Sequence, residues 1–230
     1  MEYWLAQFHV FLLILLRVSA MLAVAPVFGH RAFLARAKIG LAFMMVREIA
    51  MGVVVGFAVL LVFIGVQFAG QLAGLQMGFG IVNVIDPHSS EQVSIIGQFL
   101  NLLALLGLLT LNGHHLILSG LVNSFDAVPL GEAVFKEPII HKIIALSGTV
   151  FIIAVKISAP ILVALFMVSV AMGILARTVP QMNVFIVGFP VQLAVGTLLL
   201  MLTLPLFFIL VERLIGLVEH DVFALIDFMG

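Results

Sequence analysis

Long apolar runs separated by short polar breaks dominate the chain. A helix of about 20 apolar residues can cross the hydrocarbon core of a bilayer. Several breaks contain Pro, Asn, Gly or Asp, which end helices, and the stretch Glu212–Phe228 after the last run is amphipathic. The pattern predicts an all-α, integral-membrane-type protein with one domain over residues 1–230. Its candidate helices are Trp4–Phe28, Ile49–Leu75, Ile95–Leu111, His115–Phe125, Ile139–Leu175 and Val184–Leu210.

Two of these runs do not match the length of one membrane crossing. His115–Phe125 is too short, and Ile139–Leu175 is long, with Lys156 and Pro160 near its middle. A proline inside a helix frees a carbonyl group and kinks the helix. We therefore expect a kink at Pro160, and helices that pair with other protein rather than a simple row of crossings.

The stretch Ala35–Met45 is also shorter than a membrane crossing. It begins like a helix and then continues directly into Val46, Arg47 and Glu48. Its length corresponds to roughly half a crossing. Either this stretch is a half-length element, or the chain omits a segment between Met45 and Val46. We favour the omission.

Composition supports the membrane class and narrows the kind of partner. The chain of 230 residues is 64% hydrophobic and 9% charged, with a mean hydropathy of +1.34, which is more apolar side chain than a soluble domain of this size can bury. The net charge of −1 gives no reason to expect a nucleic-acid partner. Cysteine is absent, which excludes disulfides, iron–sulfur clusters and thiolate zinc sites. The first run is too long for the apolar part of a cleaved signal peptide.

Residues that could perform catalysis do not form a recognisable motif. Ser124 and Asp126 lie near His114 and His115, but no Gly-x-Ser-x-Gly sequence surrounds the serine. Adjacent histidines on a helix point about 100° apart, which is a poor arrangement for binding one metal ion. The stretch Gly78–Gly80 lacks the third glycine of a dinucleotide-binding fingerprint. We expect no catalytic residue, no cofactor and no metal site, and hence no enzyme.

Three charged residues lie inside the apolar pattern. They are Arg17, Glu48 and Lys156. A charge in hydrocarbon is costly and should face a partner or a wet cavity. One interpretation is an ion or substrate path. The interpretation that we prefer is a buried structural ion pair of Glu48 with Arg17 or Lys156, because no carboxylate-rich relay accompanies them.

Glycines recur at helical spacing along the apolar runs. A small residue at every fourth position creates a groove in which another helix backbone can approach closely. This spacing predicts helix-packing or subunit-interface positions, to which we add the turn before the last long run. These positions are Gly52, Gly56, Gly70, Gly74, Gly78, Pro180, Gln181 and Asn183.

The glycine series ends in a segment that should leave the helix. Gly78 and Gly80 weaken the helix, and Pro87 disfavours the helical conformation at Asp86. Irregular backbone at membrane depth is tolerated only where protein buries it or where it lines a cavity. We therefore interpret the segment as a constriction or plug, with an ordinary interhelical loop as the alternative. Its candidate residues are Met77, Phe79, Ile81, Val82, Ile85, Asp86 and Pro87.

Several separated motifs along the chain form a recognisable set. They are Arg17, Ala25-Pro26, Arg36–Leu41, Gly74–Gly80, Asp86-Pro87, Asn112–His114, Ser124-Phe125, Pro129, Arg177–Phe185 and Gly188–Pro190. Together they resemble the FliR family of flagellar biosynthesis proteins, which also includes export-apparatus subunits of virulence type III secretion systems, and the resemblance covers nearly the whole chain. In that family a full apolar segment and a polar turn stand between two motifs that lie close together here, which supports the omission near residues 45–46.

The resemblance implies a specific assembly and function. It implies helical hairpins that join several FliP and FliQ subunits in a helical, pore-forming export gate, with FlhB around it and FlhA below it in the flagellar basal body. The gate would pass unfolded flagellar export substrates across the bacterial inner membrane without covalent chemistry, and Met77–Val93 would project into the pore as its plug. The alternative is a secondary transporter or small-solute channel with broken helices at Gly78–Pro87 and Pro180–Asn183, although no paired internal repeat is visible.

Overall fold

The described part of the protein is helical. A computed structural model describes residues 35–80, 94–129, 132–179, 181 and 183–230. Within these ranges there is no strand, so the predicted all-α class is confirmed. The helices are α3 (Ala35–Met77), α5 (Ile95–Thr110), α6 (Gly113–Ala127), α7 (Glu137–Thr178) and α8 (Val184–Met229).

Three described helices are long and apolar enough to cross a membrane. They are the stretches Val46–Met77, Glu137–Thr178 and Ile186–Met229 of α3, α7 and α8. The shorter helices α5 and α6 form a pair bent by 69°, which could act as a fourth crossing. The predicted membrane-type architecture is therefore confirmed for the described residues, while the run Trp4–Phe28 lies outside them.

Two predicted boundaries differ from the structure. The stretch Ala35–Met45 is not a separate half-length element, because α3 continues through it without a break to Met77. The last apolar run and the amphipathic tail likewise form one helix, α8. Neither junction contains a glycine or proline that would end a helix. The omission near residues 45–46 stays a prediction.

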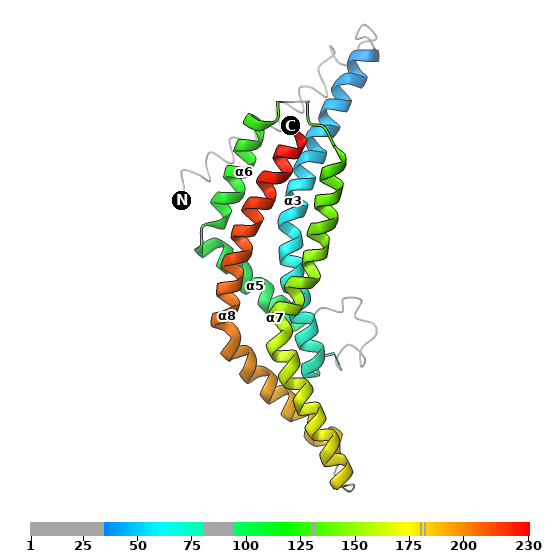
Figure 1. Cartoon of the computed structure of the whole chain (residues 1–230), viewed down its shortest axis with the longest axis vertical. Coiled ribbons are helices and arrows are strands. Elements are labelled where there is room, and N and C mark those ends of the chain that lie inside the picture. The colour runs from blue at the N-terminus through cyan, green and yellow to red at the C-terminus, as the bar shows by residue number, and fades with distance from the viewer. Residues whose placement is uncertain (1–34, 81–93, 130–131, 180, 182) are drawn as a thin grey trace, which may run out of the picture.

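Prolines do not divide the long helices. Pro160 lies inside α7, and Pro190 and Pro205 lie inside α8. Each proline removes one backbone hydrogen bond, but the remaining ladder continues on both sides. Figure 1 shows that α8 changes direction strongly along its length.

The corner between α5 and α6 explains the short predicted run at His115–Phe125. Leu111 ends α5 through a hydrogen bond from its N–H to the Gly107 carbonyl, 2.9 Å. Asn112 then takes a left-handed conformation, with φ 56°. Asparagine tolerates this conformation better than most residues with a side chain. The chain turns there, so the short run is one arm of a bent pair.

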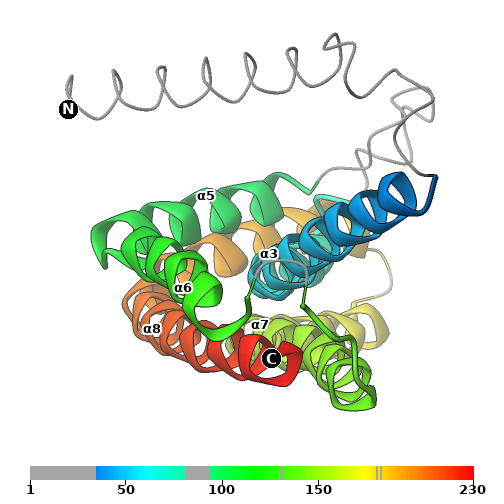
Figure 2. The same cartoon turned by 90° about the horizontal axis from the view of Figure 1, so that it is seen from above.

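Helix α3 is the centre of the bundle. It packs against α5, α7 and α8, and α6 packs against α8 on the far side (Figure 2). The core follows α3 in three clusters, which include Leu146 and Ile226 in the first, Ala154 and Phe207 in the second, and Met77 and Leu165 in the third. Beyond the end of α3, the hairpin of α7 and α8 continues alone (Figure 1).

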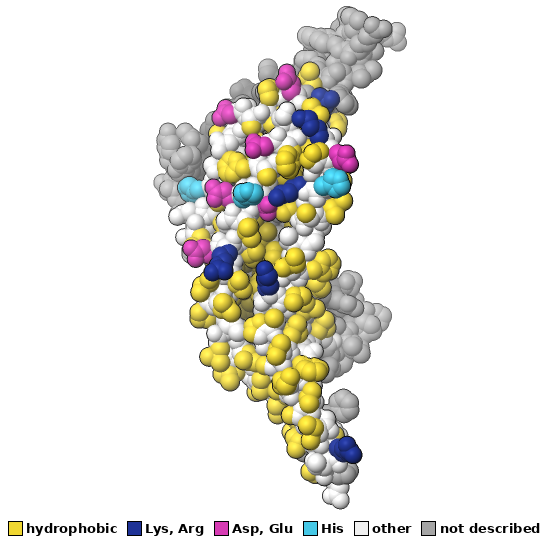
Figure 3. All heavy atoms as spheres, viewed as in Figure 1, with side chains coloured by type: hydrophobic (Ala, Val, Ile, Leu, Met, Phe, Trp, Pro, Cys, Tyr) yellow, Lys and Arg dark blue, Asp and Glu magenta, His cyan; other side chains and the backbone are white. Residues whose placement is uncertain are grey.

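Charged and apolar side chains occupy different parts of the surface. Charged groups gather over one half of the molecule, and hydrophobic side chains cover most of the other half (Figure 3). Helix α3 has no charged residue after Glu48, and α8 has none before Glu212. Many apolar side chains there are exposed, such as Phe166 at 56% and Leu202 at 67%. The described residues therefore leave a large apolar surface uncovered.

Candidate helix-packing site and base of the pore loop

Helix α3 ends in a glycine-dependent cap. Gly78 has φ +95°, a left-handed conformation that favours glycine. Its N–H donates to the Leu75 carbonyl at 3.1 Å, and the Phe79 N–H donates to the Gly74 carbonyl at 3.0 Å. These two bonds form a Schellman motif, which satisfies carbonyl groups at the helix end. A Cβ atom on Gly78 would lie 2.7 Å from the Phe189 ring.

The first two candidate plug residues contact the chain's own core. Met77 is 1% exposed, and its side chain fills the space beside Gly196 of α8, where a Cβ atom would lie 2.5 Å from the Met77 Cγ. Phe79 is partly buried and packs against the same cluster. Met77 therefore anchors the segment to α8. The other candidate plug residues, Ile81, Val82, Ile85, Asp86 and Pro87, lie outside the described residues.

The chain that returns from residues 81–93 is tied to α3 by one serine. The Ser94 hydroxyl donates to the Gly70 carbonyl at 3.4 Å. The same oxygen accepts a hydrogen bond from the Gly97 N–H at 3.2 Å, which caps the start of α5. Both ends of the segment 81–93 therefore start from one packed site, which we call the loop base. It is formed by Gly70, Gly74, Met77, Gly78 and Ser94.

The glycines at this base pack against helices of the same chain. A Cβ atom on Gly70 would lie 2.5 Å from the Gly97 Cα, and one on Gly74 would lie 2.9 Å from the Ser94 Oγ. Gly78 faces α8 through Phe189. At these three positions the groove is used for helix packing within the chain, by α5 and α8, and a contact with another subunit there stays a prediction.

The first glycine pair of α3 has a different environment. Gly52 and Gly56 are exposed, and a Cβ atom on either would meet no atom within 4 Å. They lie on the half of α3 that precedes its contacts with α5. Among the described residues, Gly52 lines a cavity of about 100 Å³ with Gly120 and Ser124 of α6, and a subunit interface at this pair stays a prediction.

The turn between α7 and α8 is also exposed. Gln181 and Asn183 are both on the surface, and Pro180 lies outside the described residues. The Asn183 carbonyl accepts from the Ile186 N–H at 3.1 Å, and its side-chain oxygen lies 3.4 Å from the same nitrogen. Asn183 therefore caps the start of α8. A subunit contact at this turn stays a prediction.

In the described part of the chain Lys156 does not pair with Glu48, and a pair of Glu48 with Arg17 stays a prediction. Glu48 is partly buried and lines a cavity with Gly120 and Ser124, whereas Lys156 lines cavities between α7 and α8. Lys156 is exposed in this chain, which corrects the expectation of a cation buried within it. Arg17 lies outside the described residues. The Lys156 side chain can lie on the outside of α7 because the described residues do not cover that surface.

One ion pair was not expected from the sequence. The Lys142 Nζ of α7 lies 2.7 Å from the Asp221 Oδ1 of α8, and both side chains are about three-quarters buried. The two residues are far apart in sequence, so no local spacing could indicate the pair. It joins the charged ends of α7 and α8.

The residues considered for catalysis have structural contacts. The Ser124 hydroxyl donates to the Leu121 carbonyl of its own helix at 2.6 Å. The rings of His114 and His115 meet edge to face, with centroids 4.3 Å apart. Within the described ranges, no three acidic or histidine side chains converge as a metal site would require.

Comparison with known proteins identifies the family. Residues 8–218 match the family model of bacterial export proteins, family 1. The chain belongs to this family. It is 36% identical to the flagellar biosynthetic protein FliR of Bacillus subtilis, with 97% of this chain and 96% of the relative covered. The FliR proteins of Pectobacterium carotovorum and Escherichia coli are 34% and 30% identical, covering 88% and 89% of this chain and 86% and 88% of the relatives.

Family membership fixes the general role. FliR proteins are components of flagellar protein export, so the chain is a membrane-embedded component of that apparatus, which assembles with other export components. The resemblance noted in the sequence is confirmed. The alignment with the Bacillus subtilis protein extends over 250 positions, more than the 230 residues of this chain, so that relative contains residues without a counterpart here.

Proposed function

We propose that the chain is a non-enzymatic subunit of a hetero-oligomeric export channel in the bacterial inner membrane, at the flagellar basal body. FliP- and FliQ-type subunits are the partners that close the channel around unfolded flagellar proteins, with FlhB- and FlhA-type proteins next to it. The segment 77–93 is its pore plug. The resemblance of the sequence to the FliR family suggested these details, and three features of the chain support them.

The first and strongest feature is the length of the uncovered apolar surface. Between Lys142 and Arg177, α7 carries one charged residue over about 50 Å of helix, at 1.5 Å per residue. A bilayer core is only about 30 Å thick. In the most apolar stretches of 18 residues of α3, α7 and α8, only 28%, 33% and 22% of the residues are buried among the described residues. Lipid cannot cover all of the remainder, so protein partners must.

The second feature is the open glycine pair Gly52 and Gly56 on α3. Glycines four residues apart let a second helix backbone come close, which favours association between apolar helices. Here no atom of the described residues lies within 4 Å of the Cβ position of either glycine. The pair is therefore suited to a helix of another subunit.

The third feature is the rigid base from which the pore loop leaves. Gly70 and Gly74 hold α5 tightly against α3, and Ser94 ties the returning chain to the Gly70 carbonyl. Residues 81–93 can then change conformation around a fixed base as a polypeptide passes. Methionine and phenylalanine suit such a constriction, because they are bulky and adaptable.

Mass measurement of the intact protein after mild-detergent purification tests this function. We expect the chain to co-purify in one complex with several copies of other apolar export subunits. When expressed alone, it should aggregate or be degraded, because its apolar surface stays open. A stable monomer or small homo-oligomer that binds a solute would instead identify a secondary transporter.

A further inference from the structure

A cavity lies open between α7 and α8, with α3 as its third wall. Its volume is about 330 Å³, within the range of small-molecule sites. Each helix contributes residues three or four positions apart, so one face of each helix points inward. Apolar side chains such as Leu61, Leu146 and Leu214 make most of this wall.

Two cations line this cavity at its end nearer the apolar half of the molecule. They are Lys156 of α7 and Arg213 of α8, and both are exposed. In the described part of the chain, neither forms an ion pair. Asp221 also lines the cavity, but its carboxylate already pairs with Lys142 at 2.7 Å. The cavity therefore carries an excess of positive charge without a matching anion.

The position of these cations matches one edge of a bilayer. On α7 no charged residue lies between Lys156 and Arg177, a rise of about 31 Å, close to the ~30 Å bilayer core. On α8 no charged residue lies between its start and Glu212. Figure 3 shows the same division, with charged side chains over one half of the molecule and apolar ones over the other.

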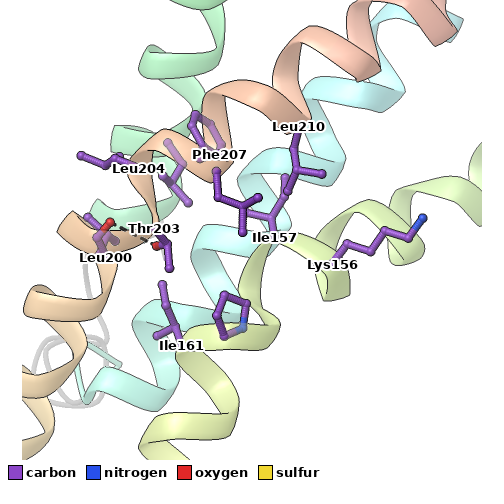
Figure 4. Close-up of a pocket in the computed structure, with 11 residues that line it drawn as sticks. Lys156, Ile157, Ile161, Leu200, Thr203, Leu204, Phe207 and Leu210 are labelled. Atoms are coloured by element: carbon purple, nitrogen blue, oxygen red, sulfur yellow. Dashed lines mark hydrogen bonds between the residues drawn. The ribbon is translucent and has the colours of Figure 1, made fainter.

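A second, mostly apolar cavity of only about 20 Å³ lies beside the same lysine, toward the uncharged half. The Lys156 stem lines it together with Pro160, Leu204 and Phe207. Figure 4 shows that the lysine amine points away from these side chains. A long side chain that buries its stem and extends its charge toward the polar zone is typical of a membrane interface.

We propose that Lys156 and Arg213 bind the phosphate of an anionic phospholipid whose acyl chains lie on the exposed apolar surface of α7 and α8. Basic pockets between membrane helices favour anionic headgroups. The 330 Å³ cavity gives the headgroup room, and exposed apolar side chains such as Phe166 and Leu202 on the uncharged side can contact the acyl chains. This site rests on the membrane character of the chain and is independent of its role in export.

Lipid binding by charge-neutral variants tests the proposal. The full chain, purified with the subunits that accompany it, is titrated with phosphatidylglycerol or phosphatidylcholine of equal chain length and measured by native mass spectrometry. We expect the wild type to prefer phosphatidylglycerol at least tenfold, and Lys156→Gln with Arg213→Gln to lose that preference. The exchange Lys156→Arg with Arg213→Lys should retain it.

The matched control is Lys136→Gln, which removes one cation from the exposed turn before α7 and should bind lipid like the wild type. Three results would overturn the proposal. One is equal binding of both lipids, and another is equal stabilisation by inorganic phosphate. The third is a double variant that still prefers phosphatidylglycerol but no longer co-purifies with partner subunits, which would assign the cations to a protein carboxylate.

Discussion

Glycines along α3 differ in what their Cα atoms face, and this difference decides what each one does. Gly70 touches the backbone of Gly97, whereas Gly52 faces open space. The same four-residue spacing therefore serves two purposes on one helix. At Gly70 it brings α5 close within the chain, and at Gly52 it leaves room for another molecule.

An alanine exchange at these two positions separates the roles. Gly70→Ala places a Cβ atom 2.5 Å from the Gly97 Cα, so a helix must move. We expect a loss of about 1–3 kcal/mol in the free energy of unfolding, as for overpacked cores. Gly52→Ala should be neutral or more stable by up to about 1 kcal/mol, through helix propensity.

Thermal unfolding in mild detergent, followed by circular dichroism, measures both variants. The Gly70→Ala midpoint should fall by several degrees, given about 2–4 °C per kcal/mol for a chain of this size. If the two variants unfolded at the same temperature, the close contact between α3 and α5 would contribute nothing to stability.

At the scale of elements, the end of α3 and the start of α5 form one base for the segment between them. Met77 packs against Gly196 of α8, and the Ser94 hydroxyl bonds to the Gly70 carbonyl. The residues that hold the base are therefore distinct from residues 81–93. A test of the plug must leave Met77, Gly78 and Ser94 in place, because their removal would disturb the helix bundle as well.

Replacing residues 81–93 by a short glycine–serine linker tests the plug. We expect the complex to assemble normally, because the base is retained, and the membrane to leak small ions, because the apolar constriction is lost. Ion conductance in reconstituted vesicles measures the leak. A scrambled sequence of the same length and composition is the control, and it should restore most of the seal. Unchanged conductance after the replacement would assign residues 81–93 to an ordinary loop.

At the scale of the whole molecule, the surface divides into a charged half and an apolar half. The apolar surface is longer than a bilayer is thick, so lipid and protein must share it. Near the charged half, α3 offers its open glycine pair, and the polar face of α8 offers Glu212, Gly216 and Glu219. Assembly should therefore depend on the first of these surfaces and not on the second.

Leucine exchanges compare the two surfaces. Gly52→Leu with Gly56→Leu should reduce co-purification of partner subunits at least tenfold, because bulky side chains separate the helices. A Cβ atom on Gly216 would also have no neighbour within 4 Å among the described residues, but Gly216 lies among charged residues. Gly216→Leu should therefore leave co-purification unchanged. Subunit stoichiometry is measured by quantitative mass spectrometry of the purified complex. Normal yield from the double variant would remove the glycine pair from the interface.

The sequence by itself determined the helical membrane class, most helix positions and the family. Apolar runs and breakers are local signals, and separated motifs such as Gly74–Gly80 retain the family's pattern. The glycine spacing likewise predicted close packing. These properties depend on neighbouring residues along the chain, so they could be predicted without a fold.

Only the tertiary structure decided which molecule each surface faces. It assigned Gly70, Gly74 and Gly78 to contacts within the chain, left no described atom near the Cβ positions of Gly52 and Gly56, and placed Lys156 and Arg213 in the wall of one cavity. It also joined Lys142 to Asp221 across two helices. Spacing along one helix shows which residues share a face, but the partner of that face depends on how helices distant in sequence pack together.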